Sequence, residues 1–305
     1  MRKIYKVAAL AAATISIAAM IGGPAQAAAK KPVLKLLWHQ EFAGKAGSGP
    51  NTKIFNYDLG GGGWGNLEHE AYVDDHAKLD GSKQGNLVIS ATRYSPDLNN
   101  DIYYQCPINT QGSACEFLSS RLQTQGNLAF QYGKVSARIK MPAGDGVWPA
   151  FWMLGNDIST NQWPNSGEID IVETRGDQYP TTVFGTAHGP GYSGENGIVN
   201  TTNTKVALSS GYHVFSVIWL KNKIQWLIDD KVFHTVTPTQ TGRNYVFNKP
   251  FFLIMNLAMG GNFVGGPVDP TLQSAQMSID WIRYYSYNGA GKVSGTKAAI
   301  AAGKP

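Results

Sequence analysis

Short strand-like segments recur along the chain from about residue 34 to residue 287. Most are rich in β-branched and aromatic residues and are bounded by Gly, Asn, Asp or Pro, which is typical of strands joined by turns. The clearest are NLVISATR (86–93), KVSARIKM (134–141), EIDIVE (168–173), TVFGTAH (182–188), HVFSVIWL (213–220), KIQWLID (223–229), PFFLIMNLAM (250–259) and MSIDWIRYYSY (277–287). No convincing amphipathic helix pattern lies among them. The sequence therefore predicts an all-β fold, an antiparallel β-sandwich.

The composition of this region is even, without a linker, a repeat or a run of charge. A β-sandwich of roughly 250 residues can form a single domain, so we expect one domain at 28–287. The segment that follows, NGAGKVSGTKAAIAAGKP (288–305), is poor in large apolar groups. We expect it to be a low-complexity, disordered tail.

The N-terminal segment 1–27 has the features of a secretory signal peptide. Arg2, Lys3 and Lys6 precede the apolar stretch VAALAAATISIAAMI, and AQA ending at Ala27 resembles a cleavage site. The apolar stretch is shorter and richer in alanine than a membrane anchor requires. We therefore expect a secreted protein, extracellular or periplasmic, with no membrane partner.

The charge of the chain argues against nucleic acid as a partner. The chain has 26 Lys and Arg against 21 Asp and Glu, and three of the basic residues lie in the signal segment. Several of the others lie in the two flanks, so the central body is close to neutral. It lacks the basic face that nucleic-acid binding requires.

Cys106 and Cys115 are the only cysteines, nine positions apart. In an exported chain this pair predicts a disulfide, and two free thiols are the alternative. A metal pair is less favoured, because no His or further Cys lies nearby at ligand spacing.

The segment EIDIVE places three acids, Glu168, Asp170 and Glu173, within an apolar strand. Alternate side chains of a strand point to opposite faces, so Glu173 should point away from the other two. A solvated edge strand would explain the acids. However, VWPAFWMLG just upstream is strongly aromatic, and like charges this close repel one another. These features favour a functional site.

Glycoside hydrolysis with retention explains the odd spacing. It uses two carboxyl groups about 5–5.5 Å apart, a nucleophile and a general acid/base. A β-bulge at Ile171 or Val172 would add one residue and return Glu173 to the face of Glu168. Asp170 could then hydrogen-bond one glutamate and hold its charge state, because neighbouring carboxyls push their pKa values apart.

The segment GEIDIVE, preceded by GVWPAFWMLG, resembles glycoside hydrolase family 16 in the bulged form of laminarinase-like endo-β-1,3-glucanases. Further stretches fit in order along nearly the whole mature chain: WHQEF (38–42), GGGGWGNLEHEAYV (60–73), GTAHGPGYSG (185–194), MNLAMGGNF (255–263) and MSIDWIRYY (277–285). The resemblance implies a jelly-roll, concanavalin A-like sandwich with a concave substrate cleft. It also implies a monomer that cleaves internal bonds of laminarin-type β-glucan and needs no cofactor for catalysis.

The resemblance also implies roles for the three acids. Glu168 is the expected nucleophile, Asp170 the assisting acid and Glu173 the general acid/base. The implied reaction has two displacements and keeps the β configuration.

Eight further residues match substrate-binding positions of the family. They are Trp64, Asn66, Glu68, Arg121, Trp148, Trp152, His188 and Asn256. Core packing is the alternative for a Trp, a surface position for the Arg, and a structural role for His188 and Asn256. The glycines at 60–63 would let Trp64 approach the substrate, or would simply form a flexible turn. Trp219, Trp226 and Trp281 lie in regular strands and are expected in the core.

Two positions depart from the family pattern. Phe263 stands where related laminarinases often have Trp, and Phe184 where they often have His. Both changes remove a polar nitrogen from the expected cleft rim, so stacking remains but particular sugar hydrogen bonds do not.

A structural calcium is implied on the face away from the cleft, at Glu41, Asp280 and the carbonyl of Gly85. Calcium takes six to eight oxygen ligands, so waters and other carbonyls would complete the site. The alternative is that Glu41 and Asp280 only form ion pairs or caps.

Two other readings of the sequence remain. A non-catalytic carbohydrate-binding sandwich would be free to lose one of the acids, and this chain keeps them. A lichenase, agarase, carrageenase or transglycosylase could use the same scaffold. The lichenase-type motif lacks the extra residue that lies here between Asp170 and Glu173.

Overall fold

The structure is a computed structural model that describes residues 31–95, 105–106 and 113–305. The predicted signal peptide, 1–27, lies outside these residues. Residues Val33–Pro305 form one compact unit. Within the described residues, no helix is long and apolar enough to cross a membrane.

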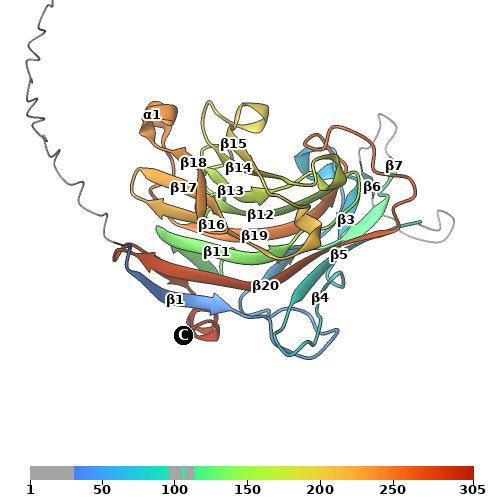
Figure 1. Cartoon of the computed structure of the whole chain (residues 1–305), viewed down its shortest axis with the longest axis horizontal. Coiled ribbons are helices and arrows are strands. Elements are labelled where there is room, and N and C mark those ends of the chain that lie inside the picture. Colours follow the sequence, from blue (N-terminus) through green and yellow to red (C-terminus); the bar gives the residue numbers. More distant parts are fainter. Residues whose placement is uncertain (1–30, 96–104, 107–112) are drawn as a thin grey trace, which may run out of the picture. The chain divides into compact units, whose positions relative to one another are not determined.

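Two large, mainly antiparallel sheets make up this unit (Figure 1). The ten-stranded sheet runs in the order β18 (Lys231–Val236), β17 (Lys223–Ile228), β16 (His213–Leu220), β11 (Gly133–Lys140), β20 (Ser274–Tyr287), β5 (Leu87–Arg93), β8 (Phe117–Ser119) and β3 (Glu70–Tyr72). In addition, β1 (Leu34–Gln40) pairs with β20, and β4 (Ala77–Leu79) pairs with β5. The one parallel pair among the described strands is β3 with β8.

The nine-stranded sheet carries the acidic strand near its middle. Its order is β15 (Ile198–Asn203), β14 (Thr182–His188), β13 (Glu168–Glu173), β12 (Val147–Gly155), β19 (Phe251–Met259), β10 (Leu128–Gln131) and β21 (Lys292–Gly295). A branch is formed by β9 (Arg121–Gln123), which pairs with β19 and with β2 (Asn56–Asp58). The predicted all-β, jelly-roll sandwich is confirmed.

Alternation along the strands separates the core from the opposite face of the nine-stranded sheet. In β12, Phe151 and Met153 are fully buried, whereas Trp148 and Trp152 on the other face are partly exposed. Fully burying such a side chain contributes about 1.5–3 kcal/mol, so the apolar positions fix which face of β12 turns inward. The predicted core residues Trp219 and Trp226 are fully buried.

Trp281 is not in the core, contrary to our expectation. It is only partly buried, and the guanidinium of Arg283 lies over its ring at 4.3 Å. A bulge in β20, between Ile279 and Trp281 opposite β11, changes the alternation at this point. The assumption of a regular strand therefore placed Trp281 on the wrong face of β20.

The prediction of a disordered tail at 288–305 is wrong. Strand β21 pairs with β10, and the short helix α2 (Lys297–Ala302) follows it. The helix packs on β1: the Trp38 indole donates to the carbonyl of Ala299 at 3.2 Å, and the amide of His39 donates to Gly303 at 2.8 Å. The small residues that suggested disorder allow this close approach, because a Cβ on Gly303 would lie 2.2 Å from Trp38 Nε1.

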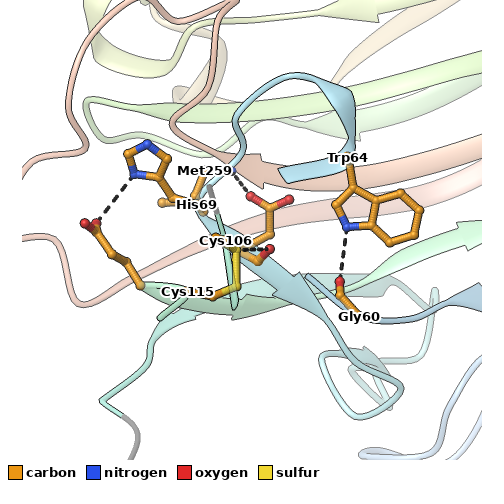
Figure 2. Close-up of a disulfide and its surroundings, with 8 residues drawn as sticks. Gly60, Trp64, His69, Cys106, Cys115 and Met259 are labelled. Atoms are coloured by element: carbon orange, nitrogen blue, oxygen red, sulfur yellow. Dashed lines mark hydrogen bonds and ion pairs between the residues drawn. A yellow bond between two sulfur atoms is a disulfide. The ribbon is translucent and has the colours of Figure 1, made fainter. Parts of the chain in front are cut away.

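The predicted disulfide is confirmed between Cys106 and Cys115, which are both buried. The bridge links Cys106, at the end of β6 (Gln105–Cys106), to Cys115, the residue that follows β7 (Ser113–Ala114). Figure 2 shows it next to the segment that carries His69 and to the loop of Gly60 and Trp64. The other α-helix of the described residues, α1 (Pro238–Thr241), is a single turn.

Candidate active site

A β-bulge in β13 puts all three acids on one face, as predicted. Asp170 lies opposite Trp152 and Glu173 opposite Ala150, so three steps along β13 match two along β12. Ile171 and Val172, the residues at the bulge, are both fully buried in the core. Since Trp152 and Ala150 are two residues apart, their partners point the same way. We call this side of the nine-stranded sheet the catalytic face.

Each acid on the catalytic face has its own nitrogen contact. The indole N–H of Trp163 donates to Glu168 Oε2 at 2.6 Å, and that of Trp148 donates to Glu173 Oε1 at 2.9 Å. His188, which is the cross-strand partner of Glu168, places Nε2 3.1 Å from Asp170 Oδ2. Trp148 and His188, two of the predicted binding residues, therefore lie beside the acids.

Burial raises the pKa of every acid in this group. The pKa of Glu168 rises to about 8 because of burial and then the charge of Asp170, with the contacts to His188 and Trp163 opposing the rise. The pKa of Glu173 rises to about 7 through burial, against the Trp148 hydrogen bond and His188. The pKa of Asp170 rises well above its ordinary value because of burial and the charge of Glu173.

Three carboxyls this close, with Asp170 buried and both glutamates half-buried, cannot all be ionised near neutral pH. We place one proton on Asp170, which is 2% exposed. A proton there removes the Asp170 charge, which adds to burial in raising the pKa of Glu168. Glu168 then becomes the favoured carboxylate, because the Trp163 N–H stabilises its anion. Glu173 keeps a proton up to about pH 7 and can act as an acid.

A second polar network continues along the catalytic face from Trp152. The Trp152 indole donates to Asn256 Oδ1 at 2.8 Å, and Asn256 Nδ2 donates to the hydroxyl of Tyr72 at 3.0 Å. Tyr72 in turn donates to Glu68 Oε2 at 3.0 Å, and the Asn66 amide donates to Glu68 Oε1 at 2.9 Å. The structure thus brings four predicted binding residues together through Tyr72.

Arg121 joins this network to the glycine-rich loop. Its guanidinium lies over the ring of Trp64 at 4.8 Å and over that of Trp152 at 4.9 Å, and it forms an ion pair with Asp58 at 2.9 Å. Trp64 also contacts Tyr72, with 5.3 Å between ring centroids. All eight predicted binding residues therefore lie in the two groups that surround β12.

The two departures from the family pattern lie in an aromatic cluster beside Glu173. Phe263 packs on Trp148 and on Phe184, with centroid distances of 5.0 and 5.2 Å. The guanidinium of Arg175 covers Phe263 at 4.3 Å and Phe184 at 4.9 Å. A charged group therefore accompanies the two phenylalanines that replace more polar side chains.

Sequence reasoning missed Trp163, Tyr72, Glu70 and Arg175 as site residues. Glu70 is fully buried beside Glu68, and burial followed by the charge of Glu68 raises its pKa well above the ordinary value. Arg175 lies two residues beyond Glu173 and lowers the pKa of that acid. Continuing the alternation past Glu173 would have placed Arg175 on the catalytic face. Tyr72 gave no local signal, because its role depends on contacts across the sheet.

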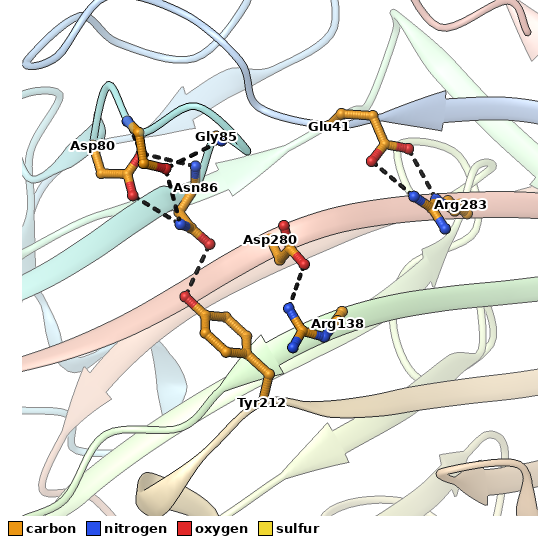
Figure 3. Close-up of polar contacts among 9 residues, drawn as sticks. Glu41, Asp80, Gly85, Asn86, Arg138, Tyr212, Asp280 and Arg283 are labelled. Carbon is orange, nitrogen blue, oxygen red and sulfur yellow. Dashed lines mark hydrogen bonds and ion pairs between the residues drawn. The ribbon is translucent and has the colours of Figure 1, made fainter.

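The predicted calcium ligands lie near one another but are largely occupied (Figure 3). Both carboxylate oxygens of Glu41 accept from Arg283, at 2.8 and 2.9 Å, and Asp280 Oδ2 accepts from Arg138. Glu41 therefore does not fit the predicted role of carboxylate ligand. Gly85 does lie against the Glu41 backbone, since a Cβ on Gly85 would be 2.7 Å from the Glu41 carbonyl oxygen.

One group of potential metal ligands occurs in the described part of the chain, and it is not the predicted one. Donor atoms of Glu168, Asp170 and His188 all lie within 4.8 Å of one another. Glu168 and Asp170 are two of the three acids on the catalytic face, and His188 lies beside them, so this group belongs to the candidate active site.

Comparisons with known proteins agree with this geometry. The family model described as glycosyl hydrolases family 16 matches residues 70–283. A glucan endo-1,3-beta-glucosidase of Cryptopygus antarcticus is 34% identical over 267 residues, covering 82% of this chain and 92% of that protein. A beta-glucanase of Rhodothermus marinus is 32% identical over 269 residues, covering 85% of this chain and 87% of that protein. The solved endo-beta-1,3-glucanase of Pyrococcus furiosus is 36% identical with a TM-score of 0.72, covering 83% of this chain and 95% of that one.

Proposed function

This chain belongs to glycosyl hydrolases family 16, and we propose that it hydrolyses internal β-1,3-glucosidic bonds of laminarin-type β-glucans with net retention. The observation that carries the proposal is the bulge that turns Glu168, Asp170 and Glu173 to one face. The relatives that match over most of their length support the choice of a β-1,3-glucan.

In the first step, the Glu168 carboxylate attacks the anomeric carbon while Glu173 gives its proton to the departing glycosidic oxygen. The Trp163 N–H keeps Glu168 oriented and supports its charge. Asp170 holds its proton between the two glutamates and limits the repulsion that a second carboxylate would cause. The products are a covalent glycosyl-enzyme and a shortened glucan.

In the second step, Glu173 is the base. It is now ionised and held by the Trp148 N–H, and it takes a proton from water as that water attacks the anomeric carbon. Glu168 leaves as a carboxylate. Two inversions at one carbon keep the β configuration.

The aromatic residues give the glucan its binding surface. Sugar rings present C–H faces that pack on aromatic rings, and Trp148, Trp152 and Trp64 are all partly exposed in the two groups of site residues. Asn66, Glu68 and Asn256 supply polar atoms between them. Arg121, stacked between two of the rings, fixes their spacing.

A substrate panel tests this proposal. Purified protein is incubated with laminarin, mixed-linkage barley glucan, cellulose and agarose, and the products are separated by size. We expect a ladder of oligosaccharides from laminarin from the earliest times, and none in a Glu168→Gln control. Release from mixed-linkage glucan alone would reassign the linkage, and no release from either glucan would refute the proposal.

We also propose that the protein is exported, acts as a monomer and holds one calcium ion. The N-terminal segment 1–27 supports export. Calcium would depend on the carbonyl of Gly85 and on the Asp280 oxygen that Arg138 leaves free, because Arg283 occupies Glu41. Light scattering of the mature protein tests the monomer, and N-terminal sequencing of the secreted product tests cleavage.

A further inference from the structure

Hydrogen bonds at Gly60 fix the start of the loop that carries Trp64. Gly60 exchanges two backbone hydrogen bonds with Tyr72, at 2.9 and 3.0 Å, and its carbonyl accepts from Trp64 Nε1 at 3.1 Å (Figure 2). Gly60, Gly62 and Gly63 have φ between 70° and 106°, and Trp64 itself has φ of 49°. Residues other than glycine rarely adopt positive φ values, and glycine itself is flexible. This loop therefore needs contacts with neighbouring segments to keep one conformation.

The disulfide-bridged strand β6 supplies that neighbour. The amide of Gly62 donates to the carbonyl of Gln105 at 2.7 Å. A Cβ on Gly61 would lie 2.5 Å from that carbonyl oxygen and 2.8 Å from Cys115 Sγ. Gly61 therefore rests directly on the bridge, and any side chain there would push the loop away from it.

The support given by β6 depends on the bridge. Strands β6 and β7 have two residues each and pair with each other. A two-stranded pair of this length is not stable by itself. Cys106 and Cys115 are each 1% exposed and pack with Ala71 on β3. The covalent link therefore fixes both the position of Gln105 and the surface on which Gly61 lies.

We propose that the Cys106–Cys115 bridge is a positioning element for the glucan, because it holds the loop that presents Trp64 to the substrate. The inference rests on the proposed function, in which Trp64 stacks on a sugar. Trp64 also forms one side of the stack around Arg121, so a displaced loop would disturb the Trp152 side as well. The acids on β13 make no contact with the bridge among the described residues.

This arrangement separates binding from chemistry. Opening the bridge should raise KM for laminarin and leave kcat close to the wild-type value. The expected rise is about 2- to 10-fold, the contribution of one aromatic contact. A bridge that only stabilised the fold would lower the melting temperature and leave the KM of the folded enzyme unchanged.

Three variants and one control test the inference in oxidised full-length protein. Cys106→Ser with Cys115→Ser removes the bridge, Gly61→Ala keeps the bridge but displaces the loop, and Trp64→Ala removes the ring. Gly211→Ala is the control, since its φ of −166° suits any residue and nothing lies within 4 Å of the added Cβ. KM and kcat for laminarin are measured well below each melting temperature.

We expect the first three variants to raise KM by similar factors and the control to match wild type. Adding the cysteine changes to Trp64→Ala should raise KM no further, because both act through one contact. If Trp64→Ala raises KM while Gly61→Ala and the cysteine variant do not, the inference is refuted and the proposed function stands. Should the cysteine variant fail to fold, Gly61→Ala decides alone. A wild-type protein inactive on laminarin would refute the proposed function instead.

Discussion

Replacing Glu173 by Gln removes the group to which we assign both the acid and the base role. The substitution keeps the shape of the side chain and the contact with the Trp148 indole, but the group no longer titrates. General acid catalysis contributes about 10²- to 10⁴-fold, so we expect kcat/KM on laminarin to fall by that factor or more. A dinitrophenyl glycoside, whose leaving group needs no proton, should lose far less in the first step.

The same substitution changes stability in a direction set by the pKa. Glu173 binds its proton up to about pH 7 in the folded protein, whereas the unfolded chain releases it near the ordinary value of 4.5. A raised carboxyl pKa gives stability that is present at low pH and is lost as pH rises through the folded value. The difference between about 7 and 4.5 corresponds to a loss of about 3 kcal/mol between those pH values. The free energy of unfolding of Glu173→Gln should not decrease in this way.

Urea unfolding followed by tryptophan fluorescence at about pH 4.5, 6 and 8 measures the effect. The free energy of unfolding of Glu173→Gln, relative to wild type, should increase with pH by about 3 kcal/mol. Glu195→Gln makes the same chemical change at an exposed position and serves as control. If both variants differ from wild type by a constant amount across this range, Glu173 is not a buried acid of raised pKa, and the assignment fails.

Three further predictions follow from other contacts. Trp148→Phe removes the hydrogen bond that lowers the pKa of Glu173, so the alkaline limb of kcat/KM should move to higher pH by about one unit; an unmoved limb would contradict this contact. Deleting 289–305 removes β21 and α2, and calorimetry should show a melting temperature about 5–10 °C lower, whereas an unchanged value would mean that the tail does not pack. EDTA should lower the melting temperature and added Ca²⁺ should restore it, while indifference to both would refute the calcium proposal.

The sequence predicted the bulge because parity is a strict property of a strand. Three acids on one face could not be reconciled with the spacing of Glu173 unless one residue was added, and Ile171 and Val172 are where the register shifts. The disulfide was equally predictable, since only one pairing of two cysteines exists. Both the bulge and the disulfide could be inferred from the spacing of residues close together in the sequence.

Features that depend on distant partners were not predictable in this way. The small residues of the tail lie close to Trp38, which composition alone does not indicate. Glu41 resembles a calcium ligand in the sequence, but Arg283 occupies both of its carboxylate oxygens in the structure.

Tyr72 and the support of Gly61 by the bridge also depend on strands far apart in the chain. Tyr72 joins Glu68 on its own segment to Asn256 on β19. Gly61 rests on Cys115, which its own neighbours in the sequence could not indicate.

The central claim is that one bulged residue turns Glu168 and Glu173 into a retaining pair. The most direct test is the anomeric configuration of the first product, followed by proton NMR during the early minutes of laminarin hydrolysis, before mutarotation mixes the anomers. The two-step mechanism predicts that the new reducing end appears first as the β anomer and that the α anomer grows in later. An α anomer that appears first would show inversion and would contradict the claim.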